Sequence, residues 1–304
     1  MMLNYHEPVM LRESLEQLGI QSRGVYVDAT YGGGGHARGI LGLLGEEGKL
    51  YAFDQDKDAL QNLSPDARLI FIQSNFSNLQ RYMEFYGVKE VDGILADLGV
   101  SSHQFDEAER GFSIRFEGPL DMRMNTEAPL TAADILNQYP IEKLSFIFRE
   151  YGDIKQTGRL VFGIEKKRET SLFETTQQLI QLAEGLCKPQ EKNQFLSKVF
   201  QALRIEVNQE LVVLKQFLAQ ACHCLKPGGK LVVISYHSGE DRLVKNFFAS
   251  GNFEGVLEKD LYGNIIRPLH PVLRKPMVPG EMELQKNNRS RSAKLRVAQK
   301  NIAA

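Results

Sequence analysis

The sequence predicts an α/β fold, in which a doubly wound parallel sheet is interrupted by an all-helical insert. Three observations predict it. Short, nearly continuous apolar runs alternate with helical patterns through the first hundred residues. This alternation is absent from about residues 109–205, where only helical patterns occur, and a strand pattern resumes at 230–235. Because the strands of a covered parallel sheet are buried on both faces, they are expected to be apolar throughout.

The elements follow in order along the chain. Apolar runs bounded by turn residues predict strands at 24–28, 50–54, 69–72 and 93–97. Helical patterns at 36–44 and 56–63 lie between them, an order typical of right-handed crossovers. In the insert we expect helices at 132–138, 141–151, 158–169, 175–185 and 191–202. The remaining expectations are an amphipathic stretch at 203–225, a turn at 226–229, a strand at 230–235, a long ordered loop at 264–292 and a last strand at 293–297.

Composition and charge narrow the class of protein. The chain has 304 residues, is 42% hydrophobic, and carries 37 basic and 38 acidic residues, a formal net charge of −1. These values are typical of a soluble globular protein, and the near-neutral total argues against indiscriminate nucleic-acid binding. No apolar run approaches the ~20 residues that span a bilayer. The stretch Met1–Glu13 lacks the apolar core of a secretory signal. We therefore expect a cytoplasmic protein with no membrane partner.

The cysteines indicate neither a disulfide framework nor a metal site. Cys187, Cys222 and Cys224 are too few and too unevenly placed for a framework. Cys222-His223-Cys224 ends a long helical pattern, where residues two apart point in different directions. No second ligand pair accompanies it, so we expect no metal.

The strongest local motif is a glycine-rich turn, Asp28-Ala-Thr-Tyr-Gly-Gly-Gly-Gly-His36, between the first expected strand and helix. Glycines there let the backbone turn sharply and approach a ligand closely. Asp54 follows Gly34 by twenty residues and ends the second strand, where a carboxylate binds ribose hydroxyls. Asp97 ends the fourth strand at the same edge of the sheet. The motif therefore predicts a nucleoside-containing ligand.

Two classes of cofactor fit such a turn. A nicotinamide site expects Gly-x-Gly-x-x-Gly facing a pyrophosphate, whereas here the glycines are contiguous and residue 37 is Ala. The form Asp-x-x-x-Gly-x-Gly favours S-adenosylmethionine, which has no phosphate and brings an ammonium group that suits a carboxylate. Another nucleotide, or a merely flexible glycine loop, stays open as an alternative.

Several long motifs resemble the small-subunit (16S) ribosomal RNA cytosine-N4 methyltransferase family (RsmH, also called MraW). They occur in the family's order across nearly the whole chain: 28–36, 97–102, 109–113, 118–124, 200–208, 235–242 and 289–296. The resemblance implies a class I (Rossmann-like) methyltransferase fold. It assigns residues 1–108 and 206–304 to the S-adenosylmethionine-binding domain and 109–205 to a helical insert for substrate recognition.

The resemblance also implies a set of cofactor-binding residues. Gly34, Gly35 and His36 would line the methionine part, Asp54 the ribose, and Phe76 the adenine, with Asp97 and Gln104 completing the pocket. Three departures from the family pattern lie outside this set: Gly239 in place of the usual Leu, the 151–154 segment, and 195–199.

The implied reaction is methylation of the N4 amine of one cytidine, in the decoding region according to the resemblance. The lone pair of that amine is delocalised into the ring, so positioning and acceptors for its protons would supply catalysis. We expect Asp97, Ser235 and His237 at the ends of strands to flank the base. The alternative is that His237 only orders the loop or packs. A DNA or small-molecule amino methyltransferase and a non-catalytic ribosome-assembly factor are the alternatives.

Local basic segments would guide RNA. Residues 284–304 contain six Lys and Arg and no acid, and 155–168 contain five against one Glu. A solvated surface accounts for either run, but the arginine density of the tail favours phosphate contact by Arg289, Arg291 and Lys294. The expected partner is ribosomal RNA within the small subunit, and a monomer and a homodimer are both compatible with the sequence.

Overall fold

The structure, a computed structural model, describes residues 8–302 and divides into two compact units. The sheet unit comprises Met1–Gly99 with Leu211–Ala304, and the helical unit comprises Val100–Glu210. Sequence patterns placed the insert at 109–205. The helical unit begins earlier because a short helix follows directly on the fourth strand, and it ends later because its last long helix continues to Asn208.

Within the described residues, the sheet unit holds one seven-stranded sheet in the order β3-β2-β1-β4-β5-β7-β6. Strands β1 to β5 are parallel, and β7 is antiparallel to β5 and β6. Their bounds are β1 Val25–Asp28, β2 Lys49–Asp54, β3 Leu69–Gln73, β4 Val91–Asp97, β5 Leu225–Ser235, β6 Leu269–Pro271 and β7 Lys294–Lys300. The six strands expected from the apolar runs are confirmed, whereas β6 lies within the expected loop.

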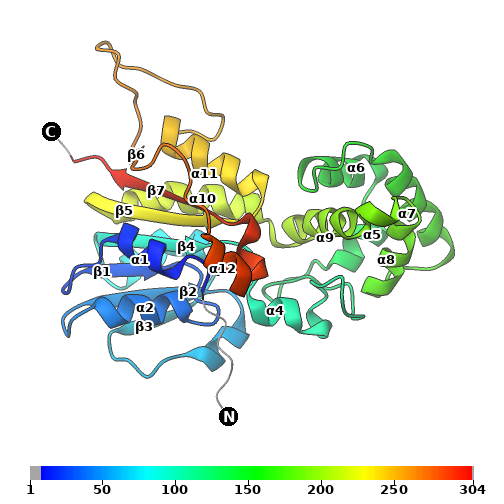
Figure 1. The fold of residues 1–304 in the computed structure, drawn as a ribbon, viewed down its shortest axis with the longest axis horizontal. Helices are drawn as coiled ribbons and strands as arrows, with labels where there is room; N and C mark the ends of the chain where they lie inside the picture. The colour runs from blue at the N-terminus through cyan, green and yellow to red at the C-terminus, as the bar shows by residue number, and fades with distance from the viewer. Residues whose placement is uncertain (1–7, 303–304) are drawn as a thin grey trace. The chain divides into compact units, whose positions relative to one another are not determined.

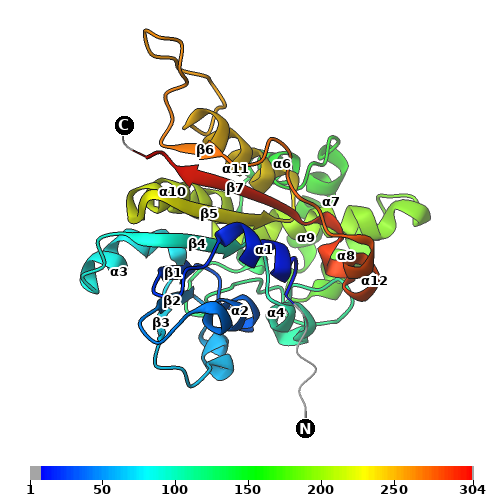
Figure 2. The same cartoon turned by 60° about the vertical axis from the view of Figure 1, so that its left-hand side comes forward.

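Helices cover both faces of this sheet (Figures 1 and 2). Side chains alternate along each strand, so Phe53, Ile94 and Val233 pack on one face with α3, α10 and α11. Ala52 and Leu95 pack on the other face with α1 and α2. The bounds are α1 Leu11–Leu18, α2 Gly35–Leu43, η1 Lys57–Asn62, η2 Phe76–Asn78, α3 Leu79–Phe85, α10 Glu210–Cys224, α11 Ser238–Ser250, α12 Glu281–Lys286 and η5 Asn288–Ser292.

The helical unit packs short helices around a separate apolar core that includes Phe148, Phe173 and Leu203. Thr131 and Thr175 begin α5 and α8 with capping boxes, each hydroxyl accepting from the backbone three residues on. The bounds are α4 Ser102–Asp106, η3 Ala108–Arg110, α5 Ala132–Gln138, α6 Ile141–Glu150, α7 Gly158–Thr170, α8 Thr176–Glu184, η4 Pro189–Glu191 and α9 Lys192–Asn208. The expected helices of the insert are confirmed.

Three predicted elements differ from the structure. The stretch 203–225 is not one helix, because Gln209 adopts a left-handed conformation, with φ of 51°, and separates α9 from α10. The expected turn at 226–229 is included in β5, at a point where pairing shifts from Val91↔Leu225 to Gly93↔Lys230. The helical segment expected at 56–63 is a 3-10 helix over Lys57–Asn62. Each difference depends on local backbone geometry that apolar periodicity does not report.

Among the described residues, no helix combines the length and the apolar character needed to cross a bilayer. The N-terminal stretch considered for a secretory signal lies partly outside the described residues.

Candidate cofactor and active site

The glycine turn joins β1 to α2 as the motif predicted. Gly32 and Gly34 have positive φ values of 49° and 71°. A Cβ added at Gly34 would lie 2.7 Å from the Tyr31 hydroxyl, so a side chain there would be both strained and crowded. At Gly33 an added Cβ would meet nothing within 4 Å. The backbone is therefore open at the point where a ligand would approach the turn.

Three aspartates stand at the carboxyl ends of neighbouring strands: Asp28 on β1, Asp54 on β2 and Asp97 on β4. Burial raises the pKa of Asp28 and of Asp97 to about 7, and that of Asp54 to about 6. Hydrogen bonds from the backbone N–H groups of Gly32 (2.7 Å) and Asp56 (2.8 Å) to Asp54 oppose this increase. This concentration of buried acid favours a positively charged ligand.

Asp28 provides a direct test of whether a cationic cofactor fits. Its Oδ1 accepts from the Thr30 backbone N–H at 3.1 Å. Its Oδ2 is buried and, within the described part of the chain, has no hydrogen-bond partner. A buried carboxylate oxygen without a donor is costly, and the ammonium group of a bound ligand would supply one. Asp28 therefore fits S-adenosylmethionine.

His36 adds a second acceptor at this edge. Its Nε2 lies 3.1 Å from the Val9 carbonyl oxygen, and because a carbonyl only accepts, we assign the ring proton to Nε2. Burial lowers the pKa of His36 to about 4, so the ring is neutral. Its Nδ1 is then a bare acceptor, 3.8 Å from Asp97 Oδ2. The neutral His36 ring therefore offers an acceptor at this edge, consistent with the methionine end of the cofactor.

Asp97 is held by groups from two other strand ends. Its backbone N–H donates to Thr30 Oγ1 at 2.7 Å, and its Oδ1 accepts from the Tyr236 hydroxyl at 2.7 Å. Tyr236 immediately follows β5. Tyr236 is not among the residues expected at the site, although Ser235 and His237 on either side of it are, because nothing in the sequence pattern shows which side chain of that segment reaches β4.

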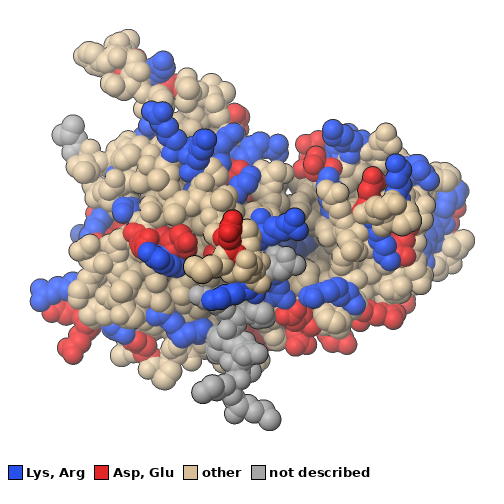
Figure 3. Space-filling view, in the orientation of Figure 1, with Lys and Arg blue, Asp and Glu red and all other residues tan. Residues whose placement is uncertain are grey.

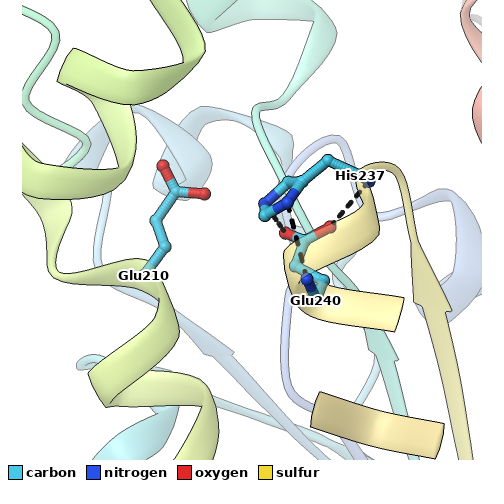
Figure 4. A group of neighbouring side chains, drawn as sticks. All are labelled: Glu210, His237 and Glu240. Atoms are coloured by element: carbon cyan, nitrogen blue, oxygen red, sulfur yellow. Dashed lines mark hydrogen bonds and ion pairs between the residues drawn. The ribbon is translucent and has the colours of Figure 1, made fainter. Parts of the chain in front are cut away.

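His237 begins α11 as its N-cap, and Figure 4 shows its ring against Glu240. Its Nδ1 accepts from the Glu240 backbone N–H at 3.4 Å, and its Nε2 lies 3.3 Å from Glu240 Oε1. Glu240 Oε2 in turn accepts from the backbone N–H groups of Tyr236 (2.9 Å) and His237 (3.3 Å). These contacts form a capping box and give His237 a structural task at the start of the helix.

Of the other expected residues, Ser235 is buried at the end of β5, with its hydroxyl 3.4 Å from the Lys294 carbonyl oxygen. Phe76 lies partly buried in η2, and its ring is edge-on to Phe217 with centroids 5.0 Å apart. Gln104 belongs to the helical unit, where its side chain accepts from the Ser101 backbone N–H and completes the capping box of α4. The sheet unit thus brings together Gly34, Gly35, His36 and the three strand-end aspartates.

The residues expected to contact RNA differ in their surroundings. Arg291 is exposed in η5, and Arg289 is partly buried. Lys294 Nζ lies 3.1 Å from Asp241 Oδ2, and Arg296 Nε lies 2.6 Å from Asp241 Oδ1. Asp241 therefore offsets part of the positive charge of the tail.

Cys222 and Cys224 are buried in the sheet unit's core. Burial raises the pKa of their thiols to about 12 and about 11, which disfavours the thiolates that bind metals.

An antiparallel β7 beside β5, a glycine turn after β1 and an acid ending β2 together define a class I S-adenosylmethionine-dependent methyltransferase. The MraW methylase family matches residues 4–301, and the chain belongs to this family. S-adenosylmethionine, the methyl donor of this enzyme, supplies an activated methyl group on a sulfonium. Asp28, His36 and Asp54 are the residues that would hold it.

Two relatives match over nearly their full lengths. The Ribosomal RNA small subunit methyltransferase H of Parabacteroides distasonis is 54% identical over 97% of each chain. The protein of the same name from Christiangramia forsetii is 52% identical over 98% of this chain and 99% of its own. Among solved structures, an rRNA methylase from Streptococcus thermophilus covers 98% of this chain with 12% identity and a TM-score of 0.42.

Proposed function

We propose that this enzyme methylates the exocyclic N4 amine of a specific cytidine in the decoding region of small-subunit ribosomal RNA. The names of relatives that are 54% and 52% identical over nearly the whole chain support the RNA substrate. An amine as the methyl acceptor is supported by the position of Asp97, a buried carboxylate held at the carboxyl edge of the sheet. An amine that takes up a methyl group must lose a proton, and a carboxylate at that edge can receive it.

The residues of the sheet unit have distinct tasks in this reaction. Asp28 and His36 present acceptors for the cofactor's ammonium group, and Asp54 accepts from the ribose hydroxyls. Phe76 offers a partly buried ring to the adenine. Asp97 hydrogen-bonds the target amine, which localises the nitrogen lone pair and holds the nucleophile in line with the methyl group. Ser235 and His237 keep the end of β5 in place beside it.

The substrate is ribosomal RNA within the small subunit, in the cytoplasm. The insert at 109–205 recognises the folded RNA. Arg291, which is exposed, and Arg289 are proposed to contact phosphates. Lys294 is proposed as a weaker contact because Asp241 already pairs with it.

The experiment is to map modified nucleosides in ribosomal RNA from cells with and without this protein. We expect one N4-methylated cytidine to disappear from small-subunit RNA and to return when the wild-type gene is restored. Restoration with an Asp97→Asn variant should not return it. Unchanged modification in cells that lack the protein would overturn the proposal.

A non-catalytic ribosome-assembly factor is the alternative from another functional class. It predicts that cells with and without the protein carry the same modified nucleosides, and that Asp97→Asn restores subunit assembly fully. If the protein were instead a DNA or small-molecule methyltransferase, labelled methyl groups would appear in DNA or in the small molecule and none would appear in ribosomal RNA.

A further inference from the structure

Tyr236 links the end of β5 to the end of β4. Its hydroxyl donates a hydrogen bond to Asp97 Oδ1 at 2.7 Å across 139 positions of sequence. Burial, followed by the negative charge of Asp97, raises the pKa of Tyr236 well above its usual value. The phenol therefore stays protonated at physiological pH and remains a donor.

The position of the tyrosine is held from two sides. Its backbone N–H donates to Glu240 Oε2 at 2.9 Å, which anchors the residue to the first turn of α11. Its ring lies against Gly99, where a Cβ, if present, would be 3.5 Å from the ring carbon Cδ2. Gly99 has φ of 98°, a conformation that other residues rarely adopt. The ring is thus seated between the loop after β4 and the start of α11.

The hydrogen bond leaves the two oxygens of Asp97 unequal. Oδ1 accepts from the phenol, whereas Oδ2 lies 3.8 Å from His36 Nδ1, a distance too long for a hydrogen bond. A hydroxyl donor aimed at one oxygen restricts rotation of the carboxylate about its Cβ–Cγ bond. It also favours the ionised form, because a carboxylate oxygen accepts a hydrogen bond more strongly than the oxygen of a neutral carboxyl does.

Other titratable groups around Asp97 come from every neighbouring element. Those that act on it or face it are Asp28 of β1, His36 of α2, Tyr236 after β5, Glu240 of α11 and Glu283 of α12. Burial and the three acids raise the pKa of Asp97, whereas the hydrogen bond from Tyr236 lowers it. His36 is neutral and supplies no compensating charge. The phenol is therefore the side chain that keeps Asp97 available as a base.

We propose that Tyr236 is a positioning residue for methyl transfer, which orients Asp97 so that Oδ2 receives the proton of the target amine. In the balanced step, a nitrogen–carbon bond forms and the methyl–sulfur bond breaks. The sulfur keeps the electron pair, and the nitrogen loses one proton to Oδ2, from which it passes to solvent. This inference rests on the proposed function, because it requires an amine acceptor.

The test is the pH profile of methyl transfer to small ribosomal subunits, at saturating S-adenosylmethionine, for the wild type and Tyr236→Phe. The variant should lower kcat by about 10- to 100-fold, the range for losing a hydrogen bond to a charged group. Its acidic limb should move to higher pH by about one unit, because the ionised form of Asp97 loses a donor. The KM for RNA should stay within about twofold, since Tyr236 makes no RNA contact in this account.

Tyr51→Phe is the matched control, because Tyr51 is buried on β2 and packs against Tyr86. It should leave the pH midpoint unchanged. Placing 3,5-difluorotyrosine at position 236 keeps the packing and strengthens the donor, so the midpoint should fall below that of the wild type. Equal pH midpoints in wild type, Tyr236→Phe and the fluorinated protein would overturn the inference. Absence of transfer by the wild type itself would instead overturn the proposed function.

Discussion

At the end of β5, three consecutive side chains have different tasks. The Ser235 hydroxyl lies near the Lys294 carbonyl oxygen, the Tyr236 phenol donates to Asp97, and the His237 ring caps α11. Sequence patterns located this segment and the acid opposite it. They did not show which side chain reaches β4, because direction at a strand end depends on the turn that follows. Asp28 could be recognised from the sequence as the acid of the glycine motif, since it ends a strand as Asp54 and Asp97 do.

The capping contact of His237 leads to a prediction about stability. His237→Ala should lower the free energy of unfolding by about 1 kcal/mol, because the Glu240 N–H loses its acceptor at the helix N-terminus. His237→Asn should restore most of that stability, since Asn is a good N-cap. Thermal unfolding of the three proteins checks this. We expect the Asn variant to retain methyl transfer; a fully stable but inactive Asn variant would instead give the ring a catalytic task.

At the scale of elements, the parallel strands place Asp28, Asp54 and Asp97 at one edge of the sheet. This arrangement could be predicted because continuous apolar runs ending in aspartate indicate strands, and parallel strands share their carboxyl edge. The separation of α9 from α10 at Gln209 could not be predicted. The stretch on either side keeps helical periodicity, and a single left-handed residue interrupts it. The short β6 was missed because three residues that include a proline do not form a strand pattern.

The acidic edge predicts how stability depends on pH. The pKa of Asp28 is about 7 in the folded protein against a usual 3.8, so between these values the folded state holds a proton that the unfolded state has released. The contribution of Asp28 to the free energy of unfolding is therefore fully present below about pH 4, and it is lost as pH rises through about 7. Asp28→Asn should make the free energy of unfolding of the cofactor-free protein fall less steeply between pH 5 and 8. Denaturant titrations at several pH values measure both slopes, and identical slopes would contradict a buried, protonated Asp28.

Cofactor binding should show the opposite dependence on pH. A cationic ligand favours ionised carboxylates, so binding of S-adenosylmethionine should release protons near pH 6.5 and tighten as pH rises toward 8. Calorimetry in two buffers of different ionisation enthalpy measures this release. Asp28→Asn should reduce it, and an unchanged proton release would argue against Asp28 as a partner of the cofactor.

At the scale of the whole molecule, a net charge of −1 is compatible with an RNA substrate because charges are distributed locally. Figure 3 shows basic and acidic side chains interspersed on the face drawn. Asp241 of α11 pairs with Lys294 and Arg296 of the tail. Burial raises the pKa of Asp241, but hydrogen bonds from Arg296 and Lys294 outweigh it and hold the pKa below its usual value. Selection of RNA should therefore depend on shape more than on total charge.

This distribution of charge predicts the salt dependence of RNA binding. Arg291→Ala should weaken binding and reduce the slope of log K against log salt by about 0.7 to 0.9, the value for one phosphate contact. Lys294→Ala should change the slope less, because Asp241 already offsets its charge. Arg12→Ala, at an exposed ion pair with Glu16 on α1, is the control. Equal slopes for the wild type and the Arg291 variant would exclude a phosphate contact at that residue.

We infer that the sheet unit transfers a methyl group to the N4 amine of one cytidine. The most direct measurement uses purified enzyme, small ribosomal subunits from cells that lack it, and S-adenosylmethionine with a deuterated methyl group. Mass spectrometry of the nucleosides should find the label on N4 of one cytidine with the wild type and at least about 100-fold less with Asp97→Asn. Label on another atom, or equal labelling by the Asp97→Asn variant, would contradict the account.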